Sequence, residues 1–353
     1  MNRREFVLSS AALMAAPAFV RAQDGLSVLI LGGTGFIGPH QVEYALAQGH
    51  KVTLFNRGKR SSKFGDAVEN LVGDRDPKVG EGLKALEGTR TWDIVIDNSG
   101  YIPRHVRASA NLLKKRCKRY IYVSTLSVYD FESGDHFAEN DPMAKPMDTE
   151  EVTGESYGAL KAECDLDVQK IYGDRCTVVR PDYIVGPGDH TDRFTYWVNR
   201  VNRGGTMLGP SGPSQTASWV DVRDLSPWLI RLGEHDKPGV YNASGPSSRI
   251  TREGLLWGLR AQTHKPVEFV WPSADFIREE KVGFGYMVPY KELSFGNRAS
   301  IEAGLSYRPL ADTAQATQSW WEAQSEERRA NARGWLDPKR EAELIEKLQA
   351  SQA

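Results

Sequence analysis

The chain has 353 residues, of which 40% are hydrophobic and 26% charged, a composition typical of a folded protein with one large or two modest domains. Its formal net charge is −1, so it lacks the basic field typical of nucleic-acid binding, and we expect no nucleic-acid partner. The three cysteines, an odd number without CxxC spacing, exclude a complete disulfide framework and predict no metal site.

Residues 1–22 have the features of an export signal. The adjacent Arg3 and Arg4 precede an apolar stretch that ends in small residues, and the pattern resembles the bacterial twin-arginine motif. Cleavage is expected after Ala22, with Ala18 as second choice. The sequence therefore predicts a periplasmic protein without a membrane anchor after cleavage. The alternative is that these residues form a short N-terminal helix of the folded domain.

A glycine-rich loop follows the first predicted strand. Residues 26–31 (LSVLIL) form a short apolar run typical of a buried parallel strand, and a helical pattern begins after Gly38. Glycines between a strand and a helix let backbone N–H groups approach a pyrophosphate at the positive end of the helix. The loop predicts dinucleotide binding through Gly32, Thr34, Gly35, Phe36, Ile37 and Gly38.

The end of the second predicted strand indicates which dinucleotide binds. An acidic residue at this position binds the ribose 2′-hydroxyl of NAD, whereas an arginine accommodates the 2′-phosphate of NADP. After the strand at residues 51–55 the chain has Asn56 and Arg57, with further cations nearby. We therefore predict NADP as the cofactor, with NAD as second choice. The alternative is a solvated basic turn.

Three further strands are predicted at residues 70–72, 93–97 and 119–123, with helical stretches between them. This alternation predicts an α/β fold with a Rossmann-type, doubly wound parallel sheet. Because ligands of such sheets lie along the carboxyl ends of the strands, Asp74, Ser99 and Thr125 are expected to line one crevice.

Tyr157 and Lys161 are spaced i, i+4, which places both side chains on one face of a helix. A free tyrosine, with a pKa of about 10, is a poor base at neutral pH. A nearby ammonium stabilises the phenolate and lowers that pKa. We therefore interpret Tyr157 as a general acid/base, with Lys161 as the group that tunes it and contacts the nicotinamide ribose.

Together these motifs resemble those of the extended short-chain dehydrogenases, which include the NAD-dependent sugar epimerases and dehydratases. Besides the glycine loop and the Tyr157–Lys161 pair, the resemblance rests on residues 122–129 (YVSTLSVY), 180–189 (RPDYIVGPGD) and 219–225 (WVDVRDL). It implies a catalytic Thr125, Tyr157 and Lys161, with Ser124 adjacent to Thr125, and places Tyr183 beside the nicotinamide. A local alternative is that Ser124 or Thr125 only caps the strand end.

Two departures from the family pattern narrow the function. Leu126 and Ser127 stand where 4,6-dehydratases carry an Asp–Glu pair, so the groups for water elimination are absent. Asn56 stands where many epimerases have Asp, and residues 56–58 with 98–101 resemble an atypical branch that includes a chloroplast stem-loop RNA-binding protein.

The C-terminal half is richer in Pro and Trp, and its pattern breaks into short segments. We predict a dinucleotide-binding domain over residues 24–181, to which 219–243 returns, and a discontinuous substrate domain over 182–218 and 244–310. Residues 311–353 are expected to form two helices separated at Pro338. These helices pack against the domain or, as the alternative, form the arm of a homodimer.

The sequence leaves three functions open. The first is an NADP-linked reductase or dehydrogenase acting on a small hydroxyl or carbonyl compound, with a sugar-like substrate as one option. The second is an epimerase that retains and recycles its cofactor. The third is an RNA-binding or structural protein that reuses the fold, because a fold does not fix a function.

Overall fold

The computed structural model describes residues 25–60, 63–284, 286–287 and 292–352, so the predicted export signal lies outside the described residues. At its centre is a seven-stranded sheet in the order β11-β7-β5-β4-β1-β2-β3, with every neighbouring pair parallel. Its strands are β1 (Ser27–Leu31), β2 (Lys51–Asn56), β3 (Glu69–Val72), β4 (Trp92–Asp97), β5 (Cys117–Val123), β7 (Cys176–Pro181) and β11 (Gly239–Ala243).

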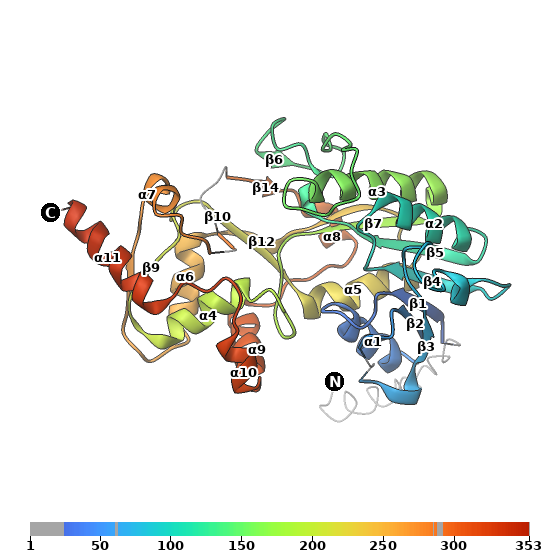
Figure 1. Ribbon diagram of the computed structural model, residues 1–353, viewed down its shortest axis with the longest axis horizontal. Helices are drawn as coiled ribbons and strands as arrows, with labels where there is room; N and C mark the ends of the chain where they lie inside the picture. Colours follow the sequence, from blue (N-terminus) through green and yellow to red (C-terminus); the bar gives the residue numbers. More distant parts are fainter. Residues whose placement is uncertain (1–24, 61–62, 285, 288–291, 353) are drawn as a thin grey trace, which may run out of the picture.

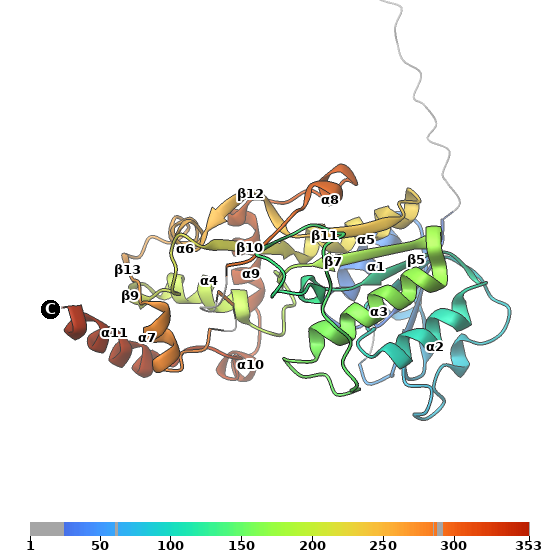
Figure 2. The same ribbon diagram turned by 90° about the horizontal axis from the view of Figure 1, so that it is seen from above.

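Helices cover both faces of this sheet (Figures 1 and 2). On one face α1 (Gly38–Ala47) packs beside α5 (Val222–Glu234), and on the other α2 (Pro103–Leu113) packs beside α3 (Tyr157–Tyr172). The apolar strand residues alternate between the two buried clusters under these helices. The predicted α/β, Rossmann-type fold is confirmed. All three cysteines are buried and form no disulfide.

A smaller part of the molecule extends from the carboxyl edge of the sheet (Figure 1). It contains the sheets β12-β10-β8 and β13-β9, and its helices α4, α6 and α9 (Leu310–Glu322) contact one another. The core of this part surrounds Trp197, which is fully buried. Its main elements are β8 (Ile184–Val185), α4 (Arg193–Arg203), β9 (Gly205–Leu208), β10 (Thr216–Asp221), β12 (Gly245–Thr251), α6 (Arg252–Arg260), β13 (Val267–Val270) and α7 (Ala274–Glu279).

Three helices, rather than the predicted two, follow residue 309. They are α9 (Leu310–Glu322), the short α10 (Glu326–Ala330) and α11, which begins at Pro338 and runs to Gln352. The extra helix forms because Ser325 caps it by accepting a hydrogen bond from the backbone N–H of Arg328. Two small elements complete the fold: the strand pair β6 (His136–Phe137) with β14 (Ser294–Phe295), and α8 (Arg298–Glu302). No helix of the described part is long and apolar enough to span a bilayer.

Candidate active site

A cleft of about 770 Å³ lies between the carboxyl edge of the large sheet and the smaller part of the molecule. This volume is in the range of small-molecule and cofactor sites. The residues predicted from sequence that line it are Gly32, Gly35, Phe36, Ile37, Ser99, Thr125, Tyr157, Lys161 and Tyr183. The structure thus brings the predicted catalytic set and most of the glycine loop into one cavity.

The glycine loop leaves room for a phosphate. Gly32 adopts a φ of +87°, which favours glycine, and a Cβ there would lie 2.8 Å from the Cβ of Ser99. A Cβ on Gly35 would meet no atom within 4 Å, so this residue faces open space in the cleft. The helix α1 begins directly after the loop, and no side chain caps its N-terminus. Free backbone N–H groups beside an open glycine fit the pyrophosphate of a dinucleotide.

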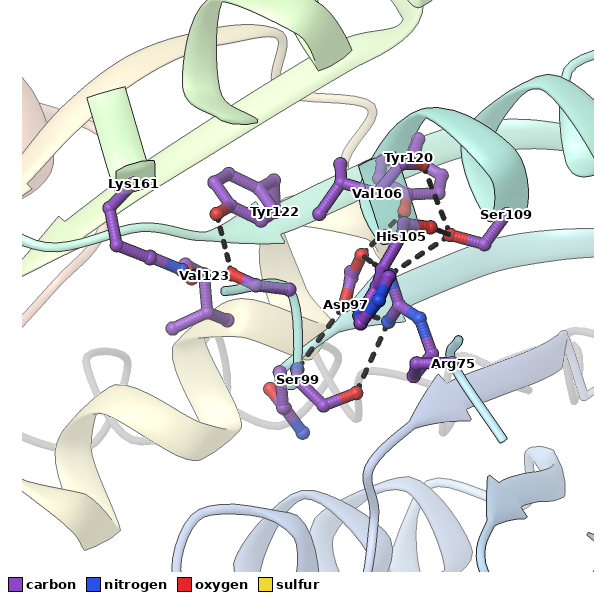
Figure 3. Close-up of polar contacts among 12 residues, drawn as sticks. Arg75, Asp97, Ser99, His105, Val106, Ser109, Tyr120, Tyr122, Val123 and Lys161 are labelled. Atoms are coloured by element: carbon purple, nitrogen blue, oxygen red, sulfur yellow. Dashed lines mark hydrogen bonds and ion pairs between the residues drawn. The ribbon is translucent and has the colours of Figure 1, made fainter. Parts of the chain in front are cut away.

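A buried ion pair fixes the strand end that faces this loop (Figure 3). Asp97, fully buried at the end of β4, accepts hydrogen bonds from both terminal nitrogens of Arg75, at 2.5 and 2.8 Å, and from Tyr120 at 2.7 Å. Arg75 also donates to the hydroxyls of Ser99 and Ser109. Burial raises the pKa of the Asp97 carboxyl, but the Arg75 guanidinium more than offsets this and holds that pKa below its ordinary value. The pair therefore locks the turn that carries Ser99.

Lys161 is buried on α3, where its ammonium donates to the carbonyls of Gly100, at 2.7 Å, and Val123, at 2.8 Å. It also stands 4.2 Å from the ring centroid of Tyr122, whose hydroxyl donates to the same Gly100 carbonyl. Burial lowers the pKa of the Lys161 ammonium to about 8. The side chain is held by the ends of β4 and β5, next to the glycine loop.

Tyr157 and Thr125 meet in the cleft. Burial raises the pKa of the Tyr157 phenol, and the Thr125 hydroxyl and the Arg193 guanidinium act against that rise. The sequence reasoning named Lys161 as the cation that tunes Tyr157. In the described residues the Lys161 ammonium donates to two backbone carbonyls, and the Arg193 guanidinium also lowers the pKa of the phenol, so the role of Lys161 in tuning Tyr157 stays a prediction.

The two hydroxyl residues after β5 have different partners. Ser124, which also lines the cleft, donates to Asp165 at 3.0 Å. Thr125 accepts a hydrogen bond from the Ser127 N–H and so caps the short 3-10 turn that follows, yet it also lines the cleft. The alternative that Thr125 caps the strand end and the proposal that it faces the substrate are thus compatible, whereas Ser124 has a structural partner.

Five predicted cofactor residues do not line the cleft within the part of the chain described: Thr34, Gly38, Asn56, Arg57 and Asp74. Gly38 packs against the loop, since a Cβ there would lie 2.2 Å from the Gly33 carbonyl oxygen. The Asn56 side chain accepts from the Gly58 N–H, and that of Asp74 from the Asp76 N–H. Arg57 is exposed at the end of β2. The roles of these residues remain predictions.

The opposite wall of the cleft contains one charged residue, Arg193, that was not predicted from the sequence. Arg193, at the start of α4, lies over the Tyr183 ring, 4.7 Å from its centroid. Asp182, which directly follows β7, and Asp189 also line the cleft, and burial raises the pKa of both carboxyls. Arg193 comes only four residues after the predicted RPDYIVGPGD motif, but nothing in the sequence indicates that α4 directs it toward Tyr157. Within the described ranges no cluster of His, Cys, Asp and Glu could hold a metal ion.

The arrangement can therefore place a dinucleotide along the glycine loop, with a proton donor and an orienting hydroxyl beside it. Fold and site together define a protein of the extended short-chain dehydrogenase type.

Comparisons with known proteins agree with this class. The model of the NAD dependent epimerase/dehydratase family matches residues 28–244, and the chain belongs to that family. It is 27% identical to the chloroplast stem-loop binding protein of 41 kDa b of Arabidopsis thaliana over 252 residues, which are 67% of this chain and 63% of the plant protein.

Solved structures share the fold. The dTDP-glucose 4,6-dehydratase of Bacillus anthracis, solved in complex with NAD, is 18% identical with a TM-score of 0.62 and matches 86% of this chain and 98% of its own. The UDP-glucuronic acid 4-epimerase of Bacillus cereus, also solved with NAD, is 14% identical with a TM-score of 0.59. The match covers 84% of this chain and 99% of the epimerase.

Proposed function

We propose that the protein is a nicotinamide-dependent oxidoreductase that acts on a hydroxyl or carbonyl carbon of a small substrate. The glycine loop would hold the nicotinamide cofactor, which would supply or accept the hydride. Tyr157 gives a proton to the substrate oxygen in reduction or removes it in oxidation, and Thr125 orients that oxygen by a hydrogen bond. Lys161 holds the ribose side of the cofactor with its ammonium.

One observation carries this proposal: Thr125, Tyr157 and Lys161 line the same cleft as Gly32 and Gly35, although they come from two different elements of the chain. Chance occurrences of a YxxxK spacing do not bring the tyrosine to an open glycine loop. The NAD-bound state of the two solved structures of similar fold supports the cofactor class.

Within that class we propose NADP over NAD. Arg57 is exposed at the end of β2 and has no hydrogen-bond or ion-pair partner among the described residues, so its guanidinium is available to pair with a 2′-phosphate. Calorimetry should show tighter binding of NADPH than of NADH by wild type, and Arg57→Ala should weaken NADPH binding by roughly tenfold. NADH binding should not change in that variant. Equal affinities that the substitution leaves untouched would refute the preference, and absence of binding by either nucleotide would refute the proposed function.

An epimerase that retains its cofactor is the second candidate, and the family to which the chain belongs favours it. The two reactions differ in whether the cofactor exchanges with solution. Denaturing the purified protein and assaying the released nucleotide, followed by a test of whether added NADPH is consumed with a confirmed substrate, separates them. A retained nucleotide without net NADPH consumption identifies the epimerase.

The third candidate is RNA binding, which the name of the plant relative suggests. The net charge of −1 speaks against it, because binding to RNA depends mainly on neutralising phosphates. Filter binding with a stem-loop RNA over a salt series tests it directly: tight binding that weakens steeply with salt would favour this function.

A further inference from the structure

Arg193 is held in a fixed orientation in the cleft. Its Nε donates to the Thr191 hydroxyl at 3.0 Å, and that hydroxyl donates to Asp189 Oδ1 at 2.6 Å. The guanidinium lies 4.7 Å from the centroid of the Tyr183 ring, and that ring contacts the Tyr286 ring at 4.8 Å. The hydrogen bond and the ring contact therefore fix the orientation of the planar guanidinium before any ligand binds.

The two terminal nitrogens of this guanidinium have no partner among the described residues. Arg193 makes one hydrogen bond, through Nε, and no ion pair within 4 Å. The nearby carboxylates have partners of their own: Asp182 accepts from the Tyr183 N–H and the Ser244 hydroxyl, and Asp189 accepts from Thr191. A positioned guanidinium with both ends unused, in a cleft, is the arrangement that binds an oxyanion.

The base of this residue is anchored from the C-terminal segment. Asp192, fully buried with a φ of +58°, accepts hydrogen bonds from Arg328 at 2.5 Å and from the Arg333 N–H at 2.9 Å. The Trp335 indole donates to its carbonyl. These contacts therefore hold the first turn of α4, from which the Arg193 side chain projects.

We propose that Arg193 binds an oxyanion of the substrate, a carboxylate or a phosphate, through Nη1 and Nη2, close to the oxygen on which Tyr157 acts. The inference rests on the proposed function, and it specifies the substrate as an anionic hydroxyl or carbonyl compound. Arg193 and Tyr157 line the same cleft, so one small ligand can contact both side chains.

Asp189 restricts further which chemical groups the ligand carries. It is 1% exposed, and its Oδ2 has no hydrogen-bond partner in the described residues. A ligand that carries a hydroxyl next to its anionic group satisfies this acceptor as well as the guanidinium. Hydroxy acids are therefore the preferred carboxylate probes.

The test uses the purified protein saturated with its nicotinamide cofactor and measures binding by calorimetry, so no turnover is needed. The probes are D-gluconate, its neutral counterpart D-glucitol, and inorganic phosphate. We expect D-gluconate or phosphate to bind and D-glucitol to bind at least about tenfold more weakly, because it lacks the charge. Arg193→Gln should lower the affinity for the anion by about tenfold or more. Arg193→Lys keeps the charge but loses the two parallel N–H donors of the guanidinium, so it should lower that affinity by less.

Arg329→Gln is the matched control, since it removes an equal charge from an exposed position on α10. It should leave anion binding unchanged. Tighter binding of D-gluconate would identify the anionic group that Arg193 binds as a carboxylate, and tighter binding of phosphate would identify it as a phosphate. Binding of neither anion, or binding that survives Arg193→Gln, overturns the proposal. Cofactor affinity is measured first on each variant; its absence in wild type refutes the proposed function, whereas normal cofactor affinity without anion binding refutes only the role of Arg193.

Discussion

The two walls of the cleft satisfy their polar groups in different ways. On the sheet wall the charges have internal partners: Asp97 binds Arg75, and Lys161 binds two backbone carbonyls. On the opposite wall Arg193 keeps both terminal nitrogens unused in the described structure, and Asp189 keeps one carboxylate oxygen unpaired. The first wall is complete without a substrate, whereas the second has donors and acceptors to offer.

This difference separates positioning from recognition. Internal partners hold the sheet wall rigid, as a cofactor site and a proton donor require. Unused but oriented groups on the other wall gain partners only when a ligand binds, so they select the ligand. We therefore expect substitutions on the sheet wall to change turnover and stability, and substitutions on the opposite wall to change which substrate binds.

The largest effect should come from Tyr157→Phe, which keeps the ring and its packing but removes the transferable proton. Turnover of any confirmed substrate should fall by about 10²- to 10⁴-fold, the usual contribution of general acid–base catalysis. Cofactor affinity, measured by calorimetry, should barely change because the glycine loop is untouched. Steady-state kinetics on the purified variant measures the fall.

Tyr241→Phe provides the control for this substitution. Its hydroxyl donates to the Pro238 carbonyl, outside the cleft, so the loss of one phenol there should leave turnover near that of wild type. Full activity in Tyr157→Phe would remove the acid/base role and with it the distinction drawn between the two walls.

The sheet wall was predictable from sequence because strand ends of a parallel sheet converge. Apolar runs that end in Gly32, Ser99 and Thr125 specify the carboxyl edge without knowledge of tertiary contacts. Asp97 was recognised only as the end of a strand. Its pairing with Arg75 depends on how the loop after β3 folds back over β4, which no local pattern encodes.

The opposite wall could not be predicted either, because no local sequence pattern encodes the long-range contacts that form it. The start of α4, which carries Arg193, is held through Asp192 by the C-terminal segment. The Arg328 that bonds Asp192 lies 136 residues further along the chain. The i, i+4 spacing of Tyr157 and Lys161 correctly placed both on α3, but periodicity does not show that backbone carbonyls hold the ammonium.

The second largest effect should be on stability, from Asp97→Asn. The substitution keeps the shape of the side chain but leaves the Arg75 guanidinium buried without a counter-charge, which costs roughly 3–5 kcal/mol when a buried pair is broken. The free energy of unfolding, measured by urea denaturation at neutral pH, should fall by that amount. Because the folded-state pKa of Asp97 is lowered, the wild-type contribution is present above the unfolded pKa and is lost as the pH falls through the folded value.

Glu43→Gln is the comparison for Asp97→Asn. Glu43 pairs with Lys63 at 2.6 Å, but both side chains are about half exposed, so its loss should cost less than about 1 kcal/mol. If the two variants were equally stable, the Arg75–Asp97 pair would not fix the sheet wall, and the contrast with the opposite wall would fail.

The smallest effect separates cofactor binding from folding and comes from Gly35→Ala. Because a Cβ at Gly35 meets no atom within 4 Å, the methyl group should leave the free energy of unfolding unchanged or slightly raised. The same methyl group enters the open part of the loop, so nucleotide affinity by calorimetry should fall by about tenfold, the loss expected from one or two displaced hydrogen bonds to phosphate.

Gly134→Ala, also with open space around its Cβ but outside the cleft, should change neither quantity. Gly38→Ala should instead lower the free energy of unfolding, since its Cβ would lie 2.2 Å from the carbonyl oxygen of Gly33. Unchanged nucleotide affinity in Gly35→Ala would mean that the phosphate does not approach the loop at this glycine, and the cofactor would then have to lie elsewhere along the sheet edge.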